Sequence, residues 1–501
     1  MDLLSHLALG LDTALSLNNL LYCFLGALFG TAVGVLPGLG PVSTIAMLLP
    51  LTYALSPVSA LIMLSGIYYG AQYGGSITAI LVNLPGESSS VVTCLDGYQM
   101  ARQGRAGSAL AVAALGSFFA GTVATVLIAA FATPLSEFAT SFRSVEYVSL
   151  MVLGLVGAVV LAHGSLIKAL AMIVLGLLLG MVGTDVNSGV ARFAFDVPEL
   201  SDGFNFVVVA MGLFAFAEII RNLEQAEAGE ASLQTVTRLW PTRDDMRRAT
   251  PAVLRGTLIG SILGVLPGGG ALMSSFASYS LEKKLSRRPQ EFGRGAIEGV
   301  AGPESANNAG AQTSFIPMLT LGIPPNPVMA LMIGAMTIHN IQPGPQVMNT
   351  DPALFWGLIT SMWIGNGILL VLNLPLIGIW IRMLRVPYRL LYPCILLCCA
   401  IGVYGIQNNL FDVLLTLPFA LLGYVFHRLG CEPAPLLLGF ILGPLLEENL
   451  RRALSLSRGD PTVFLTRPIS AALLALAAIL LVAVLVPAIK RGREVVFVDE
   501  D

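Results

Sequence analysis

The sequence predicts an all-α membrane protein that crosses the bilayer many times, and three observations lead to this fold class. Hydrophobic residues make up 55% of the 501 residues, and charged residues only 11%, whereas soluble globular chains carry about 25% charged residues. The mean hydropathy is +0.80. Long apolar stretches recur along the chain, as expected of transmembrane helices, which need about 20 apolar residues to cross the hydrocarbon core.

The clearest apolar stretches occur in both halves of the chain, separated by polar or basic segments. They are residues 109–131, 148–161, 166–182, 204–220, 354–381 and 469–489. Together with the interrupted segments described next, they predict about ten to twelve transmembrane or re-entrant segments. A multi-pass protein of this kind is expected to lie in a lipid bilayer, which is therefore its first predicted partner.

The motif GVLPGLGP at residues 34–41 interrupts an apolar stretch. Proline lacks an amide donor and glycine weakens helices, so a helix should end before this motif and a new one should start at Pro41. Irregular backbone within a bilayer is tolerated only where protein buries it or where it lines a watery cavity. We therefore expect two half-helices that meet inside the membrane, with bare amides that a ligand can approach. The expected tip consists of Pro37, Gly38, Leu39 and Gly40.

A second copy of the motif, GVLPGGGALMSSF, starts at Gly264, and its glycines match those of the first copy at a constant offset. Downstream, GAQYGGSITAILVNLPGE (70–87) parallels GAQTSFIPMLTLGIPPNP (310–327). Two copies in matching order predict an internal repeat of the kind found in transporters. Basic residues flank only the second copy, which favours two re-entrant hairpins of inverted topology. Full spans in parallel orientation are the alternative.

The repeat predicts the organisation of the whole chain. We expect a first transmembrane repeat at 1–224, a cytoplasmic linker at 225–250, a second repeat at 251–448, and a C-terminal segment with a final transmembrane helix at 449–501.

Loop charges predict the orientation of the chain, because short basic loops mark the cytoplasmic face. The basic loops are 101–107, 247–255, 282–294 and 382–389. The acidic segment 183–203 and the segment 339–351, which lacks Lys and Arg, are expected outside. The basic segment 449–467 conflicts with a simple count of spans, which would also place it outside.

Four helix breaks are predicted, at residues 37–41, 83–87, 267–270 and 322–327. Each new half-helix starts with unpaired N–H groups and about half a positive charge. Converging starts would form a pocket for a small di- or tricarboxylate without a buried Lys or Arg. The candidate substrate-binding residues are Pro37, Gly38, Leu39, Gly40, Ser43, Thr44, Asn83, Pro85, Gly86, Gly268, Gly269, Gly270, Ser274, Ser275, Asn307, Asn308 and Pro324.

The half-helix ends before the breaks expose carbonyl groups that can hold a coupling cation, either Na⁺ or a proton-bearing group. Asn83, Thr320 and Gly322 are the candidate residues for this role. No other cofactor is predicted, and the six cysteines show no metal-ligand spacing. A structural alternative is that the glycines serve only close helix packing. That alternative explains Gly26 and Gly30 but not the paired prolines.

Several long motifs resemble the large membrane subunit of tripartite tricarboxylate transporters, the TctA family. They are GVLPGLGP, YYGAQYGGSITAILVNLPGE, DGYQMARQGRAGSAL, EGVAGPESANNAGAQTSFIPMLTLGIP and HNIQPGP. The resemblance implies a secondary transporter in a bacterial inner membrane that imports carboxylates, such as citrate, on a cation gradient. It also implies two partners: a small membrane subunit of about four helices and a periplasmic solute-binding protein.

The chain departs from the family pattern at two breaks. Glu87 follows Asn-Leu-Pro-Gly where the family usually has small residues, and GIPPNP (322–327) replaces the usual Gly-Ile-Pro-Gly. Glu87 either caps the following helix or alters the substrate by repelling an anion.

Other polar residues have a functional and a structural interpretation. Asn307 and Asn308 either line the substrate path or, together with Glu304, cap a helix. Glu218 either takes part in coupling or forms an i,i+3 pair with Arg221. Asp412 is expected at the membrane interface, and His163 and His339 near the ends of spans.

A cation-coupled carboxylate symporter is the leading functional interpretation. The alternative is a passive anion channel in which the re-entrant segments form selectivity loops. A membrane enzyme has less support, because no Ser/His/Asp set, Cys/His cluster or phosphate loop occurs, so no catalytic residue is predicted. No basic or aromatic stripe suggests nucleic acid as a partner.

Overall fold

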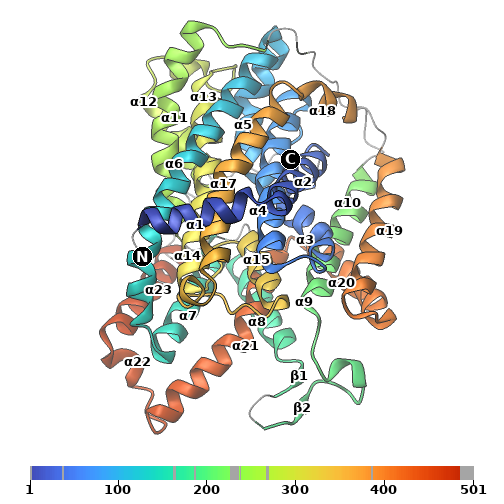
Figure 1. The fold of residues 1–501 in the computed structure, drawn as a ribbon, viewed down its shortest axis with the longest axis vertical. Helices are drawn as coiled ribbons and strands as arrows, with labels where there is room; N and C mark the ends of the chain where they lie inside the picture. The colour runs from blue at the N-terminus through green and yellow to red at the C-terminus, as the bar shows by residue number, and fades with distance from the viewer. Residues whose placement is uncertain are drawn as a thin grey trace. The chain divides into compact units, whose positions relative to one another are not determined.

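The computed structural model describes residues 3–36, 39–161, 165–185, 188–225, 236, 239–266, 270–384 and 388–485. Almost all regular structure in these ranges is helical, so the predicted all-α class is confirmed (Figure 1). The exception is one antiparallel pair of two-residue strands, β1 (Gly183–Thr184) and β2 (Ala191–Arg192), in which Gly183 lies opposite Arg192.

In the described residues, four helices are long and apolar enough to cross a membrane: Leu17–Gly34, Ala101–Phe138, Pro352–Asn373 and Leu410–Arg428. Other apolar helices in these ranges are shorter, among them Pro41–Thr52 and Pro327–Ile338. From Phe206 onward, the stretch 204–220 lies in one continuous helical run made up of α9 (Phe206–Ala210), the π-helical η5 (Met211–Phe216) and α10 (Ala217–Gln225). The number of segments and their topology therefore stay a prediction.

The chain forms two compact units: unit 1 contains Met1–Glu137 and Asn205–Val425, and unit 2 contains Phe138–Phe204 and Phe426–Asp501. These units do not follow the predicted segments 1–224, 225–250, 251–448 and 449–501, because helices after residue 138 pack on helices from the end of the chain. Helix α11 (Arg243–Leu263) begins within the predicted linker. The repeat boundaries themselves stay a prediction.

Unit 1 begins its core with α2 (Leu17–Gly34), α3 (Pro41–Thr52) and α4 (Pro57–Val82). Glycines of α2 lie directly on the backbone of α4; a Cβ on Gly30 would be only 2.3 Å from the carbonyl oxygen of Ile67. The successive contacts are Gly26 with Met63, Gly30 with Ile67 and Gly34 with Ala71. Residue numbers rise together, so α2 and α4 run parallel. The intervening α3 therefore runs back as the second arm of a hairpin.

The second half repeats this arrangement with α11, α12 (Gly270–Leu285) and α13 (Glu298–Thr313). The successive contacts are Gly256 with Gly302, Gly260 with Ala306 and Gly264 with Gly310. In both halves the glycine-rich helix ends at the LPGxG motif and a new helix follows, so the predicted interruptions are confirmed. Pro37, Gly38, Pro267, Gly268 and Gly269 lie outside the described residues.

The second break of each half has matching helix caps. Helix α4 ends at Asn83, which is left-handed with φ 56°, and α14 (Phe315–Leu321) ends at Gly322 with φ 71°. The chain resumes at η1 (Ser88–Ser90) and at α15 (Pro327–Ile338). The sequence separation between Asn83 and Gly322 is one residue shorter than that between Gly70 and Gly310, which begin the two GAQ triplets. An alignment of the two halves on these caps is therefore shifted by one residue from an alignment on the triplets.

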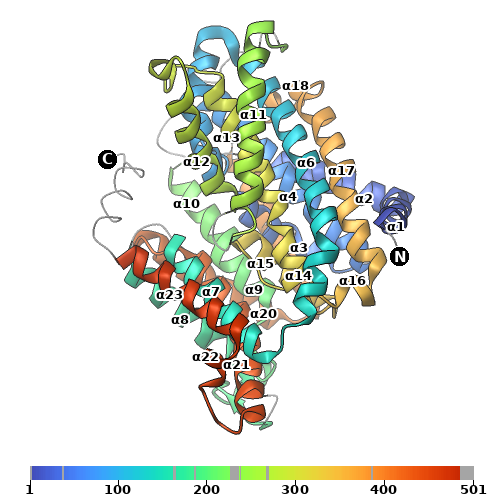
Figure 2. The same cartoon turned by 90° about the vertical axis from the view of Figure 1, so that its left-hand side faces the viewer.

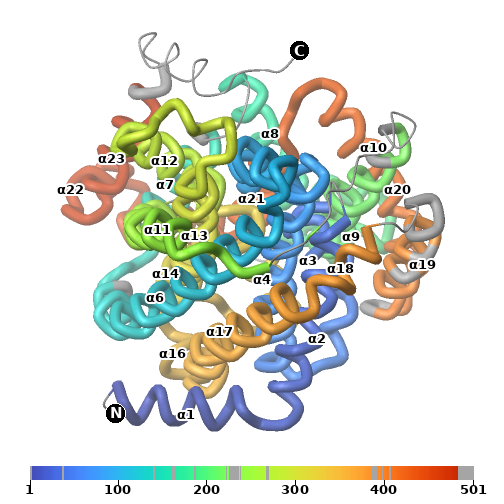
Figure 3. Tube along the Cα trace, turned by 90° about the horizontal axis from the view of Figure 1, so that it is seen from above, coloured from blue at the N-terminus to red at the C-terminus, as the bar shows by residue number. Residues whose placement is uncertain are grey.

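Further helices surround the hairpins of unit 1 (Figures 1 and 3). Helix α1 (Leu3–Leu15) crosses α17 (Pro352–Asn373), where Gly10 fits against the carbonyl of Trp356. Gly212 in η5 packs against α20 (Leu410–Arg428). The remaining elements of unit 1 are α5 (Val91–Thr93), η2 (Cys94–Tyr98), η3 (Ala101–Arg105), α6 (Ala106–Thr140), η6 (Pro289–Glu291), α16 (Val347–Thr350), α18 (Ile377–Met383) and α19 (Tyr388–Gln407).

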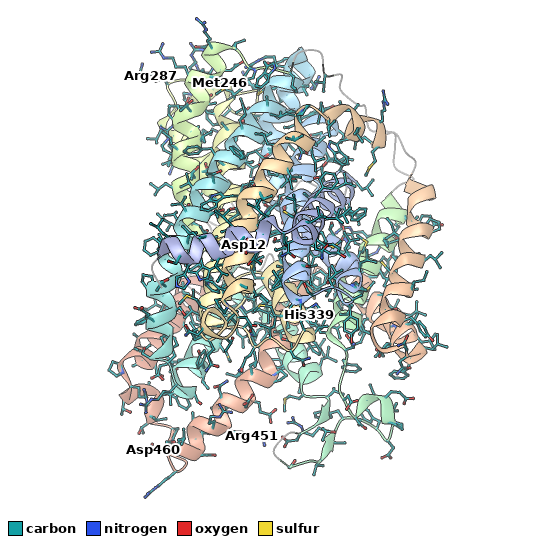
Figure 4. All side chains as sticks on the ribbon, viewed as in Figure 1. Asp12, Met246, Arg287, His339, Arg451 and Asp460 are labelled. Atoms are coloured by element: carbon teal, nitrogen blue, oxygen red, sulfur yellow. The ribbon has the colours of Figure 1, made fainter. Side chains whose placement is uncertain are left out.

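Three of the basic segments predicted to be cytoplasmic meet at one end of unit 1, where Figure 4 labels Met246 and Arg287; His339 lies toward the other end. Arg105 pairs with Asp245 at 2.5 Å, and Arg248 pairs with Glu298 at 2.8 Å. Arg248 also donates to Glu291, which lowers the pKa of that carboxyl below its usual range.

Buried Asp96 ties the same end of unit 1 together across the two halves. Its Oδ1 atom accepts hydrogen bonds from the backbone amides of Gly293, Gly295 and Ala296 at 2.8–2.9 Å. The hydroxyl of Tyr279 donates to its Oδ2 atom at 2.9 Å. A carboxylate that accepts several backbone amides is held strongly, so Asp96 fixes η2 against the chain that leads into α13.

Unit 2 consists of α7 (Ser144–Leu161), α8 (Leu166–Gly180), the β1–β2 pair, η4 (Pro198–Leu200), α21 (Pro433–Leu456), α22 (Val463–Thr466) and α23 (Pro468–Leu485) (Figure 2). Gly176 of α8 packs on the carbonyl of Leu436 in α21. Buried Glu146 of α7 pairs with Arg467, just before α23, at 2.5 Å.

Ion pairs of unit 2 bear on the basic segment 449–467. Arg451 pairs with Asp185 at 3.2 Å and with Glu447 at 2.6 Å, and Glu447 also pairs with Arg192 at 2.8 Å. The start of the basic segment therefore lies beside the acidic segment 183–203. Arg451, Arg452 and Arg467 of this segment pair with carboxylates. The side of the membrane on which the segment lies stays a prediction.

Candidate functional site

Helices α4 and α13 are buried along almost their whole length, yet polar side chains of the two helices face each other. Gln72 of α4 donates from Nε2 to Oδ1 of Asn307 at 3.3 Å. One turn further on, Ser76 donates to Oε2 of Glu304 at 2.7 Å. Each bond joins the first half of the chain to the second.

The segment that follows the second break completes this contact. Ser89 donates to Oε1 of Glu87 at 2.5 Å and lies 3.1 Å from Oδ1 of Asn307. Asn307 in turn donates from Nδ2 to Oε1 of Glu87 at 2.9 Å. The hydroxyl of Thr93 donates to Oε1 of Glu304. We call this group the central polar cluster; it consists of Gln72, Ser76, Glu87, Ser89, Thr93, Glu304 and Asn307.

The central polar cluster contains two buried carboxyl groups, Glu87 and Glu304, with 7% and 1% exposure. Their hydrogen-bond partners are hydroxyls and an amide, and no Lys or Arg in the described ranges pairs with either. Burying a carboxylate without a compensating charge is costly. The cluster therefore suits the binding of a cation.

The flanks of the four breaks converge on this cluster. Gly86, from the second break, packs against Gly75 and the carbonyl of Gly34, so a Cβ there would be 2.8 Å from that oxygen. In the other half, a Cβ on Gly270 would be 3.5 Å from Nδ2 of Asn326. Helix α13 reaches both halves, because Asn307 bonds to Glu87 and a Cβ on Gly310 would be 3.0 Å from the carbonyl oxygen of Gly270. The breaks of both halves are thus parts of one buried region.

The helix starts at the breaks differ in what already caps them. Glu87 and Ser90 form a capping box, in which the Glu87 side chain accepts from the backbone amide of Ser90 and Oγ of Ser90 accepts from the amide of Glu87, so the capping interpretation of Glu87 is confirmed. Asn326 accepts from the amide of Met329 at 3.0 Å and caps α15. Within the described ranges no side chain caps α3, whose preceding residue is Gly40. An anion therefore has freer access to the start of α3 than to the starts of η1 and α15.

Four candidate hydroxyls lie in the first turns of α3 and α12. All are buried, and each donates to a backbone carbonyl. The bonds are Ser43 to Phe214 at 3.4 Å, Thr44 to Gly40 at 2.9 Å, Ser274 to Gly270 at 2.6 Å, and Ser275 to Ala271 at 3.1 Å. These hydroxyls must rotate before they can donate to a bound carboxylate.

The remaining substrate candidates of the described ranges differ in their burial. Leu39 and Gly86 are buried, Pro85 is half-buried, and Pro324 is buried before α15. Asn308 donates to Ser117 of α6 at 2.7 Å. Asn307, Asn308 and Glu304 lie in the middle of α13, so the interpretation that they cap a helix is wrong. Their roles in substrate binding stay predictions.

The candidate cation residues are not brought together by any hydrogen bond among the described residues. Asn83 is exposed, whereas buried Thr320 donates to the carbonyl of Ile316 at 2.7 Å within its own helix. Gly322 forms the left-handed end of α14. Their role in coupling stays a prediction.

Other residues from the sequence interpretation have clear positions. Glu218 and Arg221 form the expected i,i+3 ion pair. Asp412 is buried in the first turn of α20, and His339 follows α15 as its C-cap. His163 lies outside the described residues.

The sequence analysis missed Gln72, Ser76 and Thr93. A signal for the first two was present, because they are spaced four apart on one face of an otherwise apolar helix. Polar side chains inside a membrane segment are costly and are functional candidates by default. Nothing in the sequence indicates that Thr93 would reach Glu304.

Comparisons with known proteins agree with these motifs. A family model described as the tripartite tricarboxylate transporter TctA family matches residues 20–438. An uncharacterised 52.8 kDa protein of the TAR-I ttuC' 3' region of Agrobacterium vitis is 62% identical over the full length of both chains. A second uncharacterised protein, from the TAR-II ttuC' 3' region, is 63% identical over its whole length and covers 48% of this chain. No solved structure matches.

Proposed function

Because the chain belongs to the tripartite tricarboxylate transporter TctA family, we propose that it is the large transport subunit of a secondary transporter that imports citrate-like di- or tricarboxylates on a cation gradient. A periplasmic solute-binding protein delivers the substrate, and a small four-helix membrane subunit completes the complex in the bacterial inner membrane. The family supports a role as a transporter component; the buried cluster supports the coupling to a cation.

The observation that carries the proposal is the junction at Asn307. This side chain bonds to Gln72 and Glu87 and lies against Ser89, so helices from both halves meet at one buried polar point. Transporters with internal repeats hold substrate and ions where such halves meet. The parallel pairs α2–α4 and α11–α13 support two repeated hairpins, and the basic flanks of the second hairpin support inverted topology.

The charges suggest how cation and anion binding are coupled. We place the substrate carboxylates at the start of α3 and of α12, near the hydroxyls of Ser43, Thr44, Ser274 and Ser275. Glu87 and Glu304 would repel that anion while they are ionised. A bound cation removes the repulsion, so each ligand raises the affinity for the other. Such reciprocal binding is what symport requires.

Uptake into liposomes tests the proposal. The chain is reconstituted with its small subunit and solute-binding protein, and uptake of labelled di- and tricarboxylates is measured with and without a cation gradient. We expect gradient-driven uptake that needs the binding protein. The sequence puts Gly38 at a tip where a ligand approaches bare backbone, so Gly38→Leu should abolish uptake without preventing membrane insertion.

Gly367→Leu is the matched control, because a Cβ at Gly367 meets no atom within 4 Å, and it should retain uptake. Steady anion currents without the binding protein would favour the channel instead. Normal uptake kinetics in Gly38→Leu would contradict the proposed site.

A further inference from the structure

A small cavity lies beside the central polar cluster, between α4, α6, α13 and α17. Its volume is about 10 Å³, which is room for about one water molecule. Five of its lining side chains carry oxygen atoms, and the others are apolar. The oxygen-bearing residues are Tyr73, Ser76, Ser117, Glu304 and Asn373.

Two of these oxygen atoms are buried without a hydrogen-bond partner in the described part of the chain. They are the hydroxyl of Tyr73 and Oδ1 of Asn373, on side chains with 4% and 3% exposure. A buried polar atom without a partner costs about 1–3 kcal/mol. The two atoms come from different helices and line the same cavity, so one small ligand can contact both.

The charge of the lining limits the class of ligand. Glu304 is the single ionisable carboxyl among the lining residues, and no group of three or more His, Cys, Asp or Glu side chains in the described ranges could hold a metal ion. One carboxylate with neutral oxygens balances a monovalent cation. Oxygen ligands are those that hard cations prefer.

We propose that this cavity binds one Na⁺ ion through Glu304, Tyr73 and Asn373, with Ser76 and Ser117 nearby. The hydroxyls of Ser76 and Thr93 donate to the two oxygens of Glu304, so both oxygens act as acceptors, as in an ionised carboxylate that can bind a cation. Na⁺ is smaller than a water molecule and fits this volume, whereas K⁺, which is close to a water molecule in size, leaves no room for the oxygens to close in on it. The role of this Na⁺ as the coupling ion rests on the proposed transport function.

The position of the cavity explains how the ion affects the substrate. Glu304 and Asn307 lie one turn apart on α13, and Asn307 bonds to Glu87 at the second break. Neutralising Glu304 lowers the negative potential around that break. The ion site is therefore distinct from Asn83, Thr320 and Gly322, and adjoins the region assigned to the substrate.

Binding is tested on the purified full-length chain in lipid nanodiscs, without substrate or partner proteins. Thermal unfolding is followed while NaCl replaces KCl at constant ionic strength, because a ligand of the folded state raises its stability with concentration. We expect a saturable, Na⁺-specific rise in Tm. Glu304→Gln should abolish the rise, and Tyr73→Phe should raise the half-saturating Na⁺ concentration about tenfold or more.

Tyr69→Phe is the matched control. Tyr69 lies one turn before Tyr73 on α4, is equally buried, and also has a hydroxyl without a partner in the described chain, but it does not line the cavity. It should leave the Na⁺ response unchanged. If Glu304→Gln does not fold, Tyr73→Phe and Asn373→Leu still decide the question.

The proposal is overturned if the folded wild-type chain responds equally to Na⁺ and K⁺, or if Tyr69→Phe weakens the response as much as Tyr73→Phe. The assay needs no transport. A Na⁺ response without carboxylate uptake therefore refutes the proposed function and leaves the ion site standing. Carboxylate uptake that does not depend on Na⁺ refutes Na⁺ as the coupling ion and leaves the transport of carboxylates standing.

Discussion

Asn307→Leu is expected to reduce carboxylate uptake about a hundredfold or more. The substitution keeps a similar volume but removes the amide that accepts from Gln72 and donates to Glu87. It leaves a buried carboxyl oxygen and a buried amide with fewer partners, and such losses cost about 1–3 kcal/mol each. Because this side chain joins the two halves, its loss should disturb the arrangement that holds the helix breaks close to each other. Initial rates in proteoliposomes, at equal protein content, measure the effect.

Ser305→Ala is the matched control for Asn307→Leu. Ser305 lies on the same helix and is fully buried, but its hydroxyl bonds only to the carbonyl of Ala301 one turn earlier. We expect uptake within about twofold of wild type, since losing such a local bond costs little. If the two variants lose uptake equally, the junction at Asn307 has no special role and the effect is one of α13 stability.

Gly30→Ala and Gly260→Ala are expected to destabilise the folded protein strongly and to a similar extent. A Cβ at either position would lie 2.3 Å from a backbone carbonyl oxygen, of Ile67 in one case and Ala306 in the other. Backbone cannot move aside as a side chain can, so the helices must separate. Overpacking of this kind costs about 1–3 kcal/mol or more. Thermal unfolding and size-exclusion profiles in detergent measure the loss.

The control for the glycine variants is Gly405→Ala, where a new Cβ meets no atom within 4 Å. This variant should match wild type in Tm, or exceed it slightly, because alanine favours helices over glycine. A mild effect of Gly30→Ala together with a severe effect of Gly260→Ala would contradict the equivalence of the two hairpins.

The sequence predicts the local features of this fold well. Proline and glycine act on their own backbone, so the interruptions at both LPGxG motifs follow from residue type alone. The i,i+3 pair of Glu218 and Arg221 follows from helical spacing in the same way. The repeat itself is visible because matching motifs recur in the same order.

The site is predicted less completely, because its bonds join segments far apart in the chain. Glu304 reaches Ser76 and Thr93, and nothing local to any of the three residues indicates the others. A polar residue near a proline in an apolar run has the pattern of a helix cap, which is why Glu304 and Asn307 invite that interpretation. Their actual place, in mid-helix between buried partners, depends on how α4 and α13 pack.

Packing also decides the grouping of the chain into units. Residues 138–204 belong to the predicted first repeat at 1–224, yet they pack with residues 426–501, through contacts such as Glu146 with Arg467. Charge counting at 449–467 likewise takes no account of distant partners. Arg451 is matched by Asp185, a carboxylate that lies far away in sequence.

The most direct test of the convergence of the helix breaks is a cysteine cross-link between Ser89→Cys and Asn307→Cys, introduced into a chain without native cysteines. Oγ of Ser89 lies 3.1 Å from Oδ1 of Asn307. A protease site added after Gln225 separates the two halves, so a cross-link keeps the fragments together on a denaturing gel. The pair Ser149→Cys and Ser470→Cys, 2.6 Å apart as hydroxyls, is the positive control.

We expect the fragments of the Ser89–Asn307 pair to stay linked after mild oxidation in membranes, and those of a Ser89–Thr313 pair to separate, because Thr313 faces the backbone of α11. Separation of the Ser89–Asn307 fragments, in a sample whose positive control cross-links, would contradict the convergence of the two halves at one buried site.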